Sequence, residues 1–361
     1  MIRAWTDFEG ALPEERIERL EDDAFRLHAY SETERESFRL DCGWENTRST
    51  PVPIHLEVRW PTRDFSELRD CFYWRGDQEQ DWTACLGTTA PGQSFLTITV
   101  PPGRGMLSLH PYYACGDLER FLGSLPASDL RVSVFGRSEH GRPLHQLAVG
   151  PEGAPVFLVT ARNHANETSG NYCMEGMVRW LLSEAPLACY CRRHCRVVLV
   201  PMTNPDGVAE GMARYSRPRG ADLHRTADWN RRHVDGFAGD AALEDCFSLY
   251  RQLRPAFFLN LHSYLFKFKD QIFAADEAMI RHFTTFMPDQ VHVGKTWYKT
   301  VSPQSDHPTG WCAGQFGTVP LILEIPWFMR TAASMRQTGA AILQAALLTR
   351  TLDADVVWGR L

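Results

Sequence analysis

The residues best suited to catalysis lie directly after short apolar runs. His164 and Glu167 follow the run 156–161 and stand three positions apart. An apolar, β-branched run that stops at polar residues predicts a strand that ends in a turn, and α/β folds place their chemistry at that edge of the sheet. A His and a Glu are two of the three protein ligands of a His2Glu zinc site, whose fourth position stays open for water. The pair therefore predicts part of a catalytic metal site.

Two later apolar runs also end at residues of this kind. The run 257–261 ends at His262, and the run 319–323 ends at Glu324. A single strand-end histidine is most often an ordinary polar residue, so the combination carries the prediction. We expect His164, Glu167 and His262 to hold one zinc ion, which would lower the pKa of a bound water and polarise a carbonyl. Glu324, a second carboxylate outside the metal's ligands, would move a proton from that water to the leaving amine.

The pattern of elements changes near residue 120. Short strand-like runs separated by turn-forming residues predict a small antiparallel β-sandwich domain over residues 1–120. From residue 121 to 361 strands alternate with helices, which is typical of an α/β layer fold. The expected strands are 154–161, 197–201, 257–261 and 319–323, and the expected helices are 168–183, 240–253 and 331–352. A chain of 361 residues is also long enough for two cores.

Composition excludes several classes of function. The chain is 44% hydrophobic and 23% charged, with a formal net charge of −6. A nucleic-acid binder would need a basic face, and a membrane-spanning helix would need about 20 consecutive apolar residues. Neither feature is present in the sequence, and the first residues carry no signal-peptide core. We therefore expect a cytoplasmic protein with neither a nucleic acid nor a membrane as partner.

The cysteines offer a weaker metal hypothesis. Of ten in the chain, Cys189, Cys191 and Cys195 cluster around His194. Cys and His are zinc ligands, but the paired C-x2-C spacing is missing and the segment leads straight into a strand. Reduced thiols are therefore favoured over a second metal site.

Taken in order, these residues resemble the zinc metallocarboxypeptidases of the funnelin type, and most closely the cytosolic carboxypeptidase-like branch and its bacterial relatives. The resemblance implies a mixed sheet flanked by helices, preceded by a β-sandwich domain, with one zinc ion per chain. The segments that carry it are His164-Ala-Asn-Glu167, Asn204-Pro-Asp-Gly207, Gly211-Met-Ala-Arg214, Asp222-Leu-His-Arg225, Leu261-His-Ser263 and Leu323-Glu-Ile-Pro326.

The resemblance also implies roles for residues beside the metal. Arg214 corresponds to the arginine that stabilises the developing oxyanion, and Arg225 to part of the clamp on a terminal carboxylate. His224 stands where the family has an asparagine, so its donation to a carboxylate would depend on tautomer and pH. Tyr298 is the nearest candidate for the family's mobile tyrosine.

The specificity pocket is expected in the loop 302–316. Its possible wall residues are Asp306, His307, Thr309 and Trp311. Asp306 would suit a basic side chain, but an aspartate in a loop is more often a turn former. The sequence does not identify the leaving residue.

Three hypotheses for function follow. The first is a zinc hydrolase that removes a C-terminal amino acid from a peptide or amino-acid conjugate with a free C-terminal carboxylate. The second is a zinc amidase or deacylase acting on a small acylamino acid. The third is a catalytically inactive peptide-binding module, which is disfavoured because the three ligands and Glu324 are all present.

Overall fold

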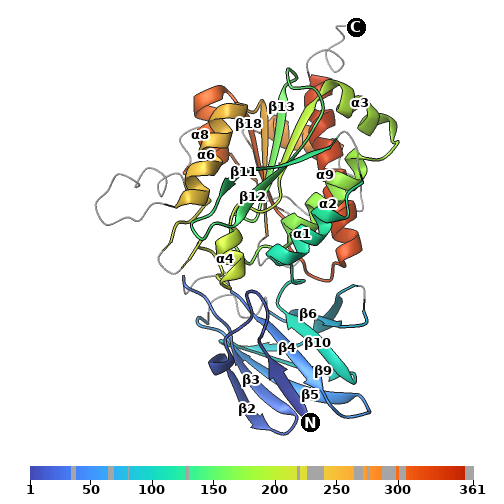
Figure 1. The fold of residues 1–361 in the computed structure, drawn as a ribbon, viewed down its shortest axis with the longest axis vertical. Helices are drawn as coiled ribbons and strands as arrows, with labels where there is room; N and C mark the ends of the chain where they lie inside the picture. Colours follow the sequence, from blue (N-terminus) through green and yellow to red (C-terminus); the bar gives the residue numbers. More distant parts are fainter. Residues whose placement is uncertain are drawn as a thin grey trace, which may run out of the picture.

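The computed structural model describes residues 1–33, 38–63, 69–79, 81–126, 130–217, 220–225, 240–263, 271–274, 277–286, 298–300 and 306–353. The chain forms two stacked parts, a smaller all-β part that contains the N-terminus and a larger α/β part (Figure 1). The larger part carries every residue that we expect to do chemistry.

The smaller part is a sandwich of two five-stranded sheets, with the orders β1-β4-β10-β6-β7 and β2-β3-β5-β9-β8. In β5 every second side chain (Val52, Ile54, Leu56) is buried between the sheets, while His55 faces out, as the two-residue period of a strand requires. The predicted sandwich is confirmed, although β3 and β5 pair in parallel. Its elements are β1 (Ile2–Trp5), a 3-10 turn (Glu14–Arg16), β2 (Ile17–Glu21), β3 (Ala24–His28), β4 (Asp41–Asn46), β5 (Val52–Arg59), β6 (Cys71–Gly76), β7 (Thr83–Leu86), β8 (Thr88–Ala90), β9 (Gln93–Val100) and β10 (Gly103–Ser108).

The larger part is built on an eight-stranded mixed sheet with the order β11-β12-β14-β13-β15-β18-β16-β17. Its central strands β14, β13, β15 and β18 are parallel, and β12 and β16 run antiparallel to their inner neighbours. The strands are β11 (Arg131–Arg137), β12 (Pro143–Val149), β13 (Val156–Ala161), β14 (Arg196–Val200), β15 (Phe257–His262), β16 (Gln271–Ala274), β17 (Tyr298–Thr300) and β18 (Val319–Glu324). The mixed sheet expected from the sequence is therefore confirmed.

Helices cover both faces of this sheet (Figure 1). The reason is visible in β13, which is apolar except for Thr160. Phe157 and Val159 join the core on one face, and Val156 and Leu158 join the core on the other, as expected of a strand buried on both sides. The helices are α1 (Cys115–Gly123), α2 (Ser169–Leu181), α3 (Pro186–His194), α4 (Pro205–Ala209), α6 (Ala241–Leu253), α7 (Glu277–Thr285), α8 (Pro308–Phe316) and α9 (Ala332–Asp353).

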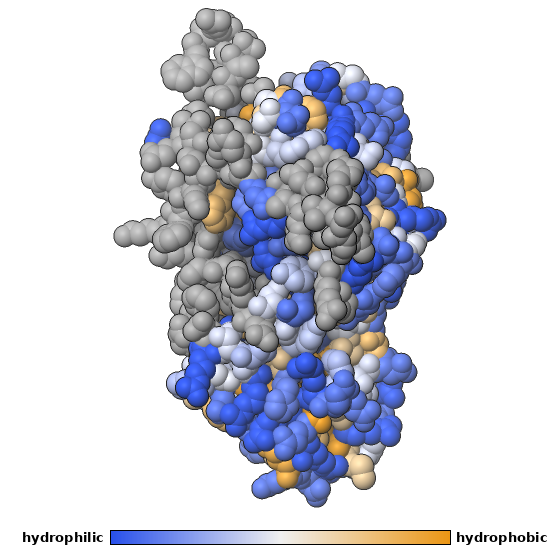
Figure 2. All heavy atoms as spheres, turned by 90° about the vertical axis from the view of Figure 1, so that its left-hand side faces the viewer, coloured by the Kyte–Doolittle hydropathy of each residue, from blue (hydrophilic) through white to orange (hydrophobic). Residues whose placement is uncertain are grey.

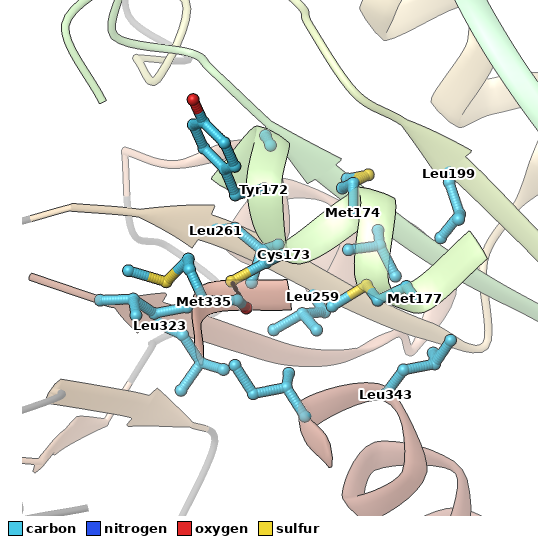
Figure 3. Packing of buried hydrophobic residues seen from close by; sticks show 14 of the residues in the cluster. Tyr172, Cys173, Met174, Met177, Leu199, Leu259, Leu261, Leu323, Met335 and Leu343 are labelled. Carbon is cyan, nitrogen blue, oxygen red and sulfur yellow. Dashed lines mark hydrogen bonds between the residues drawn. The ribbon is translucent and has the colours of Figure 1, made fainter. Parts of the chain in front are cut away.

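Helix α2, which begins just after Glu167, is held against α9. Cys173 and Met177 of α2 pack together with side chains from the sheet and from α9 (Figure 3). The two helices approach so closely that a Cβ atom at Gly339 would lie 2.0 Å from the carbonyl oxygen of Cys173. Glycine is therefore required there, and the position of α2 is fixed by backbone contact.

The surface and the cysteines agree with the composition. The face in Figure 2 is mostly hydrophilic over its described residues. No helix among the described residues is long and apolar enough to cross a membrane. None of the ten cysteines, all of which lie in described residues, forms a disulfide, and Cys189, Cys191 and Cys195 are not among the described groups of side chains close enough to bind a metal ion.

Candidate active site

The proposed ligands meet because parallel strands end at one edge of the sheet. His262 is the last residue of β15 and lies directly opposite Glu324, the last residue of β18. β13 is the other neighbour of β15, and its chain continues into the turn that carries His164 and Glu167. The apolar runs therefore bring all four residues to the same edge of the sheet.

His164, Glu167 and His262 form a buried cluster. The two Glu167 oxygens each contact one imidazole, at 2.8 Å from Nδ1 of His164 and 2.8 Å from Nδ1 of His262. Each residue offers one atom that can bind a metal ion, and these three atoms lie within 4.8 Å of one another. The three residues are 4%, 6% and 1% exposed, so this close polar grouping is shielded from water.

The cluster fits a zinc ion. Two imidazoles and one carboxylate are a ligand set of catalytic zinc. Nε2 of His262 is buried and has no hydrogen-bond partner among the described residues. A buried polar atom without a partner costs free energy unless a water, ion or ligand satisfies it. The sequence prediction that these three residues come together as a metal site is thus matched by their geometry.

The electrostatics of the cluster favour an ionised carboxylate. Burial alone would raise the pKa of Glu167, but the two imidazoles outweigh it and hold that pKa well below its usual range. Burial alone would lower the pKa of His164, but Glu167 and Asp222 together outweigh it and raise the pKa to about 9. For His262 burial prevails and the pKa is lowered. Because an imidazole must be neutral to bind metal, metal binding here releases a proton.

Asp222 connects the cluster to both arginines. Its Oδ1 lies 3.3 Å from Nε2 of His164, and its Oδ2 accepts a hydrogen bond from Nε of Arg214 at 2.8 Å. Nε of Arg225 is 3.8 Å from the same oxygen. Burial would raise the pKa of Asp222, but His164 and Arg214 together lower it strongly. A single carboxylate therefore orients one proposed ligand and one proposed catalytic arginine.

The ring of His224 is held by an asparagine that sequence reasoning missed. Nδ2 of Asn260 lies 3.2 Å from Nδ1 of His224, and Oδ1 of Asn260 accepts a hydrogen bond from Thr160 at 2.9 Å. Since an amide nitrogen can only donate, Nδ1 of His224 must accept, and Nε2 carries the proton of the neutral ring. Burial, followed by the neighbouring His262 and His307, lowers the pKa of His224 well below its usual value. His224 is therefore a neutral donor, as an asparagine amide would be.

The prediction of a loop over 302–316 was wrong for residues 308–316, which form helix α8, and His307 just before this helix lies beside the ring of His224. The ring of His307 stacks on His224 with centroids 4.4 Å apart, and Nη1 of Arg225 lies 3.1 Å from Nδ1 of His307. Burial, followed by the charge of Arg225, lowers the pKa of His307 to about 4. Thr309 is fully buried and Trp311 packs against Phe247 of α6, so these two contribute to the packing of α8.

Tyr298 is the first residue of β17, opposite Ile272. Its side chain lies outside the described part of the chain, as do residues 302–305 of the loop. The role expected for Tyr298 stays a prediction.

The loop of Arg214 is also reached from the sandwich domain. The Glu32 carboxylate accepts hydrogen bonds from consecutive backbone amides around Arg214, and Arg39 donates to the carbonyl oxygen of Ala165, between two proposed ligands. Sequence reasoning missed both residues, because neither lies in a recognisable motif. Asn260 did leave a signal, as a polar residue inside the apolar run 257–261.

Comparisons with known proteins agree with this site. Residues 121–264 match the zinc carboxypeptidase family. Zebrafish cytosolic carboxypeptidase 2 is 30% identical over 168 residues, 42% of this chain and 22% of that protein. Human cytosolic carboxypeptidase 6 is 39% identical over 98 residues, 25% of this chain and 19% of that protein. The matched region is thus about a fifth of the length of each relative.

Two solved structures share the fold over nearly the whole chain. A metallo-carboxypeptidase from Burkholderia cenocepacia superposes with a TM-score of 0.76 at 20% identity and covers 97% of this chain and 98% of that one. A metallo-carboxypeptidase from Pseudomonas aeruginosa, in complex with (2-guanidinoethylmercapto)succinic acid, gives 0.77 at 16% identity, with 97% and 100% covered. At these identities the likeness concerns the fold, and it includes the sandwich.

Proposed function

We propose that this chain, whose residues 121–264 match the zinc carboxypeptidase family, is a zinc carboxypeptidase that hydrolyses the C-terminal peptide or amide bond of a peptide or amino-acid conjugate with a free terminal carboxylate. The observation that carries the proposal is the buried cluster of His164, Glu167 and His262, with Glu324 beside it in strand register. This arrangement supplies a metal site and a separate carboxylate at one sheet edge, and together these groups can hydrolyse an unactivated amide.

Each residue has a defined task in this proposal. His164, Glu167 and His262 would hold one zinc ion, which when bound supplies an acidified water and polarises a carbonyl. Glu324 accepts a proton from the attacking water and transfers it to the leaving nitrogen, so that an amine and a carboxylate are released. Arg214 places its guanidinium where negative charge develops on the carbonyl oxygen.

The substrate carboxylate would be bound by Arg225 and His224. A guanidinium can donate to both oxygens of a carboxylate. The Asn260 contact leaves the Nε2 proton of His224 as the donor, so this residue can take over the family asparagine's task without becoming charged. Asp222 and His307 hold Arg225 in this region. We propose Tyr298 as a further substrate contact on the resemblance alone.

The first test is a comparison of peptides with free and amidated C-termini. A carboxypeptidase must cleave the free set and fail on the amidated set, because the amide lacks the charge that Arg225 binds. Glu324→Gln should lower kcat by about two to four orders of magnitude while zinc content stays near one per chain. The exposed Glu152→Gln is the matched control. A protein that binds no zinc would refute both enzymatic hypotheses.

Two alternatives are resolved by the same measurements. A deacylase would hydrolyse small acylamino acids and leave peptides uncleaved, and an inactive binding module would bind free C-termini without turnover.

We further propose domain limits of 1–120 for the sandwich and 121–361 for the catalytic domain. A cytoplasmic location is proposed from the names of the relatives, which are cytosolic carboxypeptidases.

A further inference from the structure

The sandwich domain reaches into the proposed active site through one carboxylate. Glu32 lies between β3 and β4, and it accepts hydrogen bonds from three consecutive backbone amides, those of Ala213, Arg214 and Tyr215, at 2.9, 2.5 and 2.7 Å. The first of these bonds goes to Oε2 and the other two go to Oε1. Hydrogen bonds to an ionised acceptor are about twice as strong as neutral ones.

Two carbonyl groups of the same segment are held by the catalytic domain. Nδ2 of Asn204 donates to the carbonyl oxygens of Arg214 and Tyr215 at 3.3 and 3.1 Å. The backbone amide of Arg214 is therefore bound by Glu32 of the sandwich domain, and its carbonyl oxygen is bound by Asn204 of the catalytic domain. The side chain is fixed in turn by Asp222, which accepts from its Nε.

We propose that Glu32 is a positioning residue for Arg214, so that the sandwich domain completes the active site. This inference rests on the proposed function, in which Arg214 stabilises the oxyanion. A loop with unbound amides would exchange hydrogen bonds with water and allow the guanidinium to move. The carboxylate removes that freedom, and preorganised donors are the ones that stabilise a transition state.

Two reference values limit the expected loss of kcat from above. Loss of one oxyanion donor lowers kcat by about 10²–10³-fold, which is the expectation for Arg214→Ala. A misplacement of about 1 Å can cost about 10²-fold. We therefore expect Glu32→Ala to lower kcat by about 10- to 100-fold while zinc content stays unchanged. Glu32→Gln, which keeps an acceptor oxygen but loses the charge, should fall between Glu32→Ala and the wild type.

The decisive experiment is a double-mutant cycle on the full chain. If Glu32 acts through Arg214, then adding Glu32→Ala to Arg214→Ala should cause no further loss of kcat. Tyr73→Phe is the matched control, because it removes another hydrogen bond between the two parts of the chain, from Tyr73 to the carbonyl oxygen of Trp327 at 2.7 Å. That control should lower thermal stability and leave kcat near the wild-type value.

Hydrogen exchange gives a readout that does not need turnover. Glu32→Ala should speed amide exchange at residues 213–215, and Tyr73→Phe should not. Wild-type kcat in zinc-loaded Glu32→Ala, or the same loss of kcat in both backgrounds, would overturn the inference. Unchanged exchange at 213–215 would overturn it as well. A wild type without peptidase activity would instead refute the proposed function, and exchange would still decide whether Glu32 orders the loop.

Discussion

Zinc affinity should depend on Asp222, which is not itself one of the proposed ligands. Asp222 is 5% exposed and its Oδ1 lies 3.3 Å from Nε2 of His164. A carboxylate beside a ligating histidine fixes the ring and increases its basicity, and its loss typically weakens metal binding by about 10- to 100-fold. Asp222→Asn keeps the size of the side chain and removes the charge.

The geometry selects the lower part of that range. A separation of 3.3 Å is just beyond the usual 2.7–3.2 Å for a hydrogen bond, so the contact between Asp222 and His164 is a weak one. We therefore expect about tenfold weaker zinc binding, equivalent to about 1.4 kcal/mol. Turnover should fall further than zinc occupancy explains, because the Arg214 Nε donor loses its charged acceptor.

The assay is competition for zinc against a chromogenic chelator at constant pH. Asp240→Asn is the control, since Asp240 is equally buried and caps α6 through Leu243, a task that asparagine performs as well. The reasoning is refuted if Asp222→Asn binds zinc within twofold of both the wild type and the control. It is also refuted if both variants lose zinc equally.

Two further predictions concern packing and pH. Gly339→Ala should lower the free energy of unfolding by about 1–3 kcal/mol, because the added Cβ meets the carbonyl oxygen of Cys173. The higher helix propensity of alanine offsets up to about 1 kcal/mol of this loss. Calorimetry can compare this variant with Gly123→Ala, where the added Cβ meets nothing within 4 Å. The pKa of His307 is lowered to about 4 in the folded state, so the unfolded chain binds more protons as pH falls from about 6.5 to 4, and stability is lost over that window. The melting temperature of the metal-free protein should therefore fall more steeply between pH 6.5 and 4 than that of metal-free His307→Gln. Parallel plots of melting temperature against pH for the two proteins would contradict the lowered pKa of His307.

The local part of the fold was predictable. Strands β13, β15 and β18 were expected within two residues of their observed limits, because continuous apolar runs between polar turns have few alternatives in an α/β protein. Helices α6 and α9 were expected within one residue of their observed limits, from Pro255 after the first and from the content of Ala, Leu and Gln in the second. Strands β11 and β12 were not predicted. The side chains of β11 are largely exposed, so its sequence lacks the apolar pattern that marks a buried strand.

The sequence by itself determined which residues come together as the metal cluster, since residue type and strand-end position are both local properties. Only the tertiary structure decided how the neighbouring groups act. The tautomer of His224 depends on Asn260, 36 positions away, and the backbone of Arg214 is held by Glu32, 182 positions away. A hydrogen bond of this kind is set by the packing of two elements or two domains, so no local pattern records it.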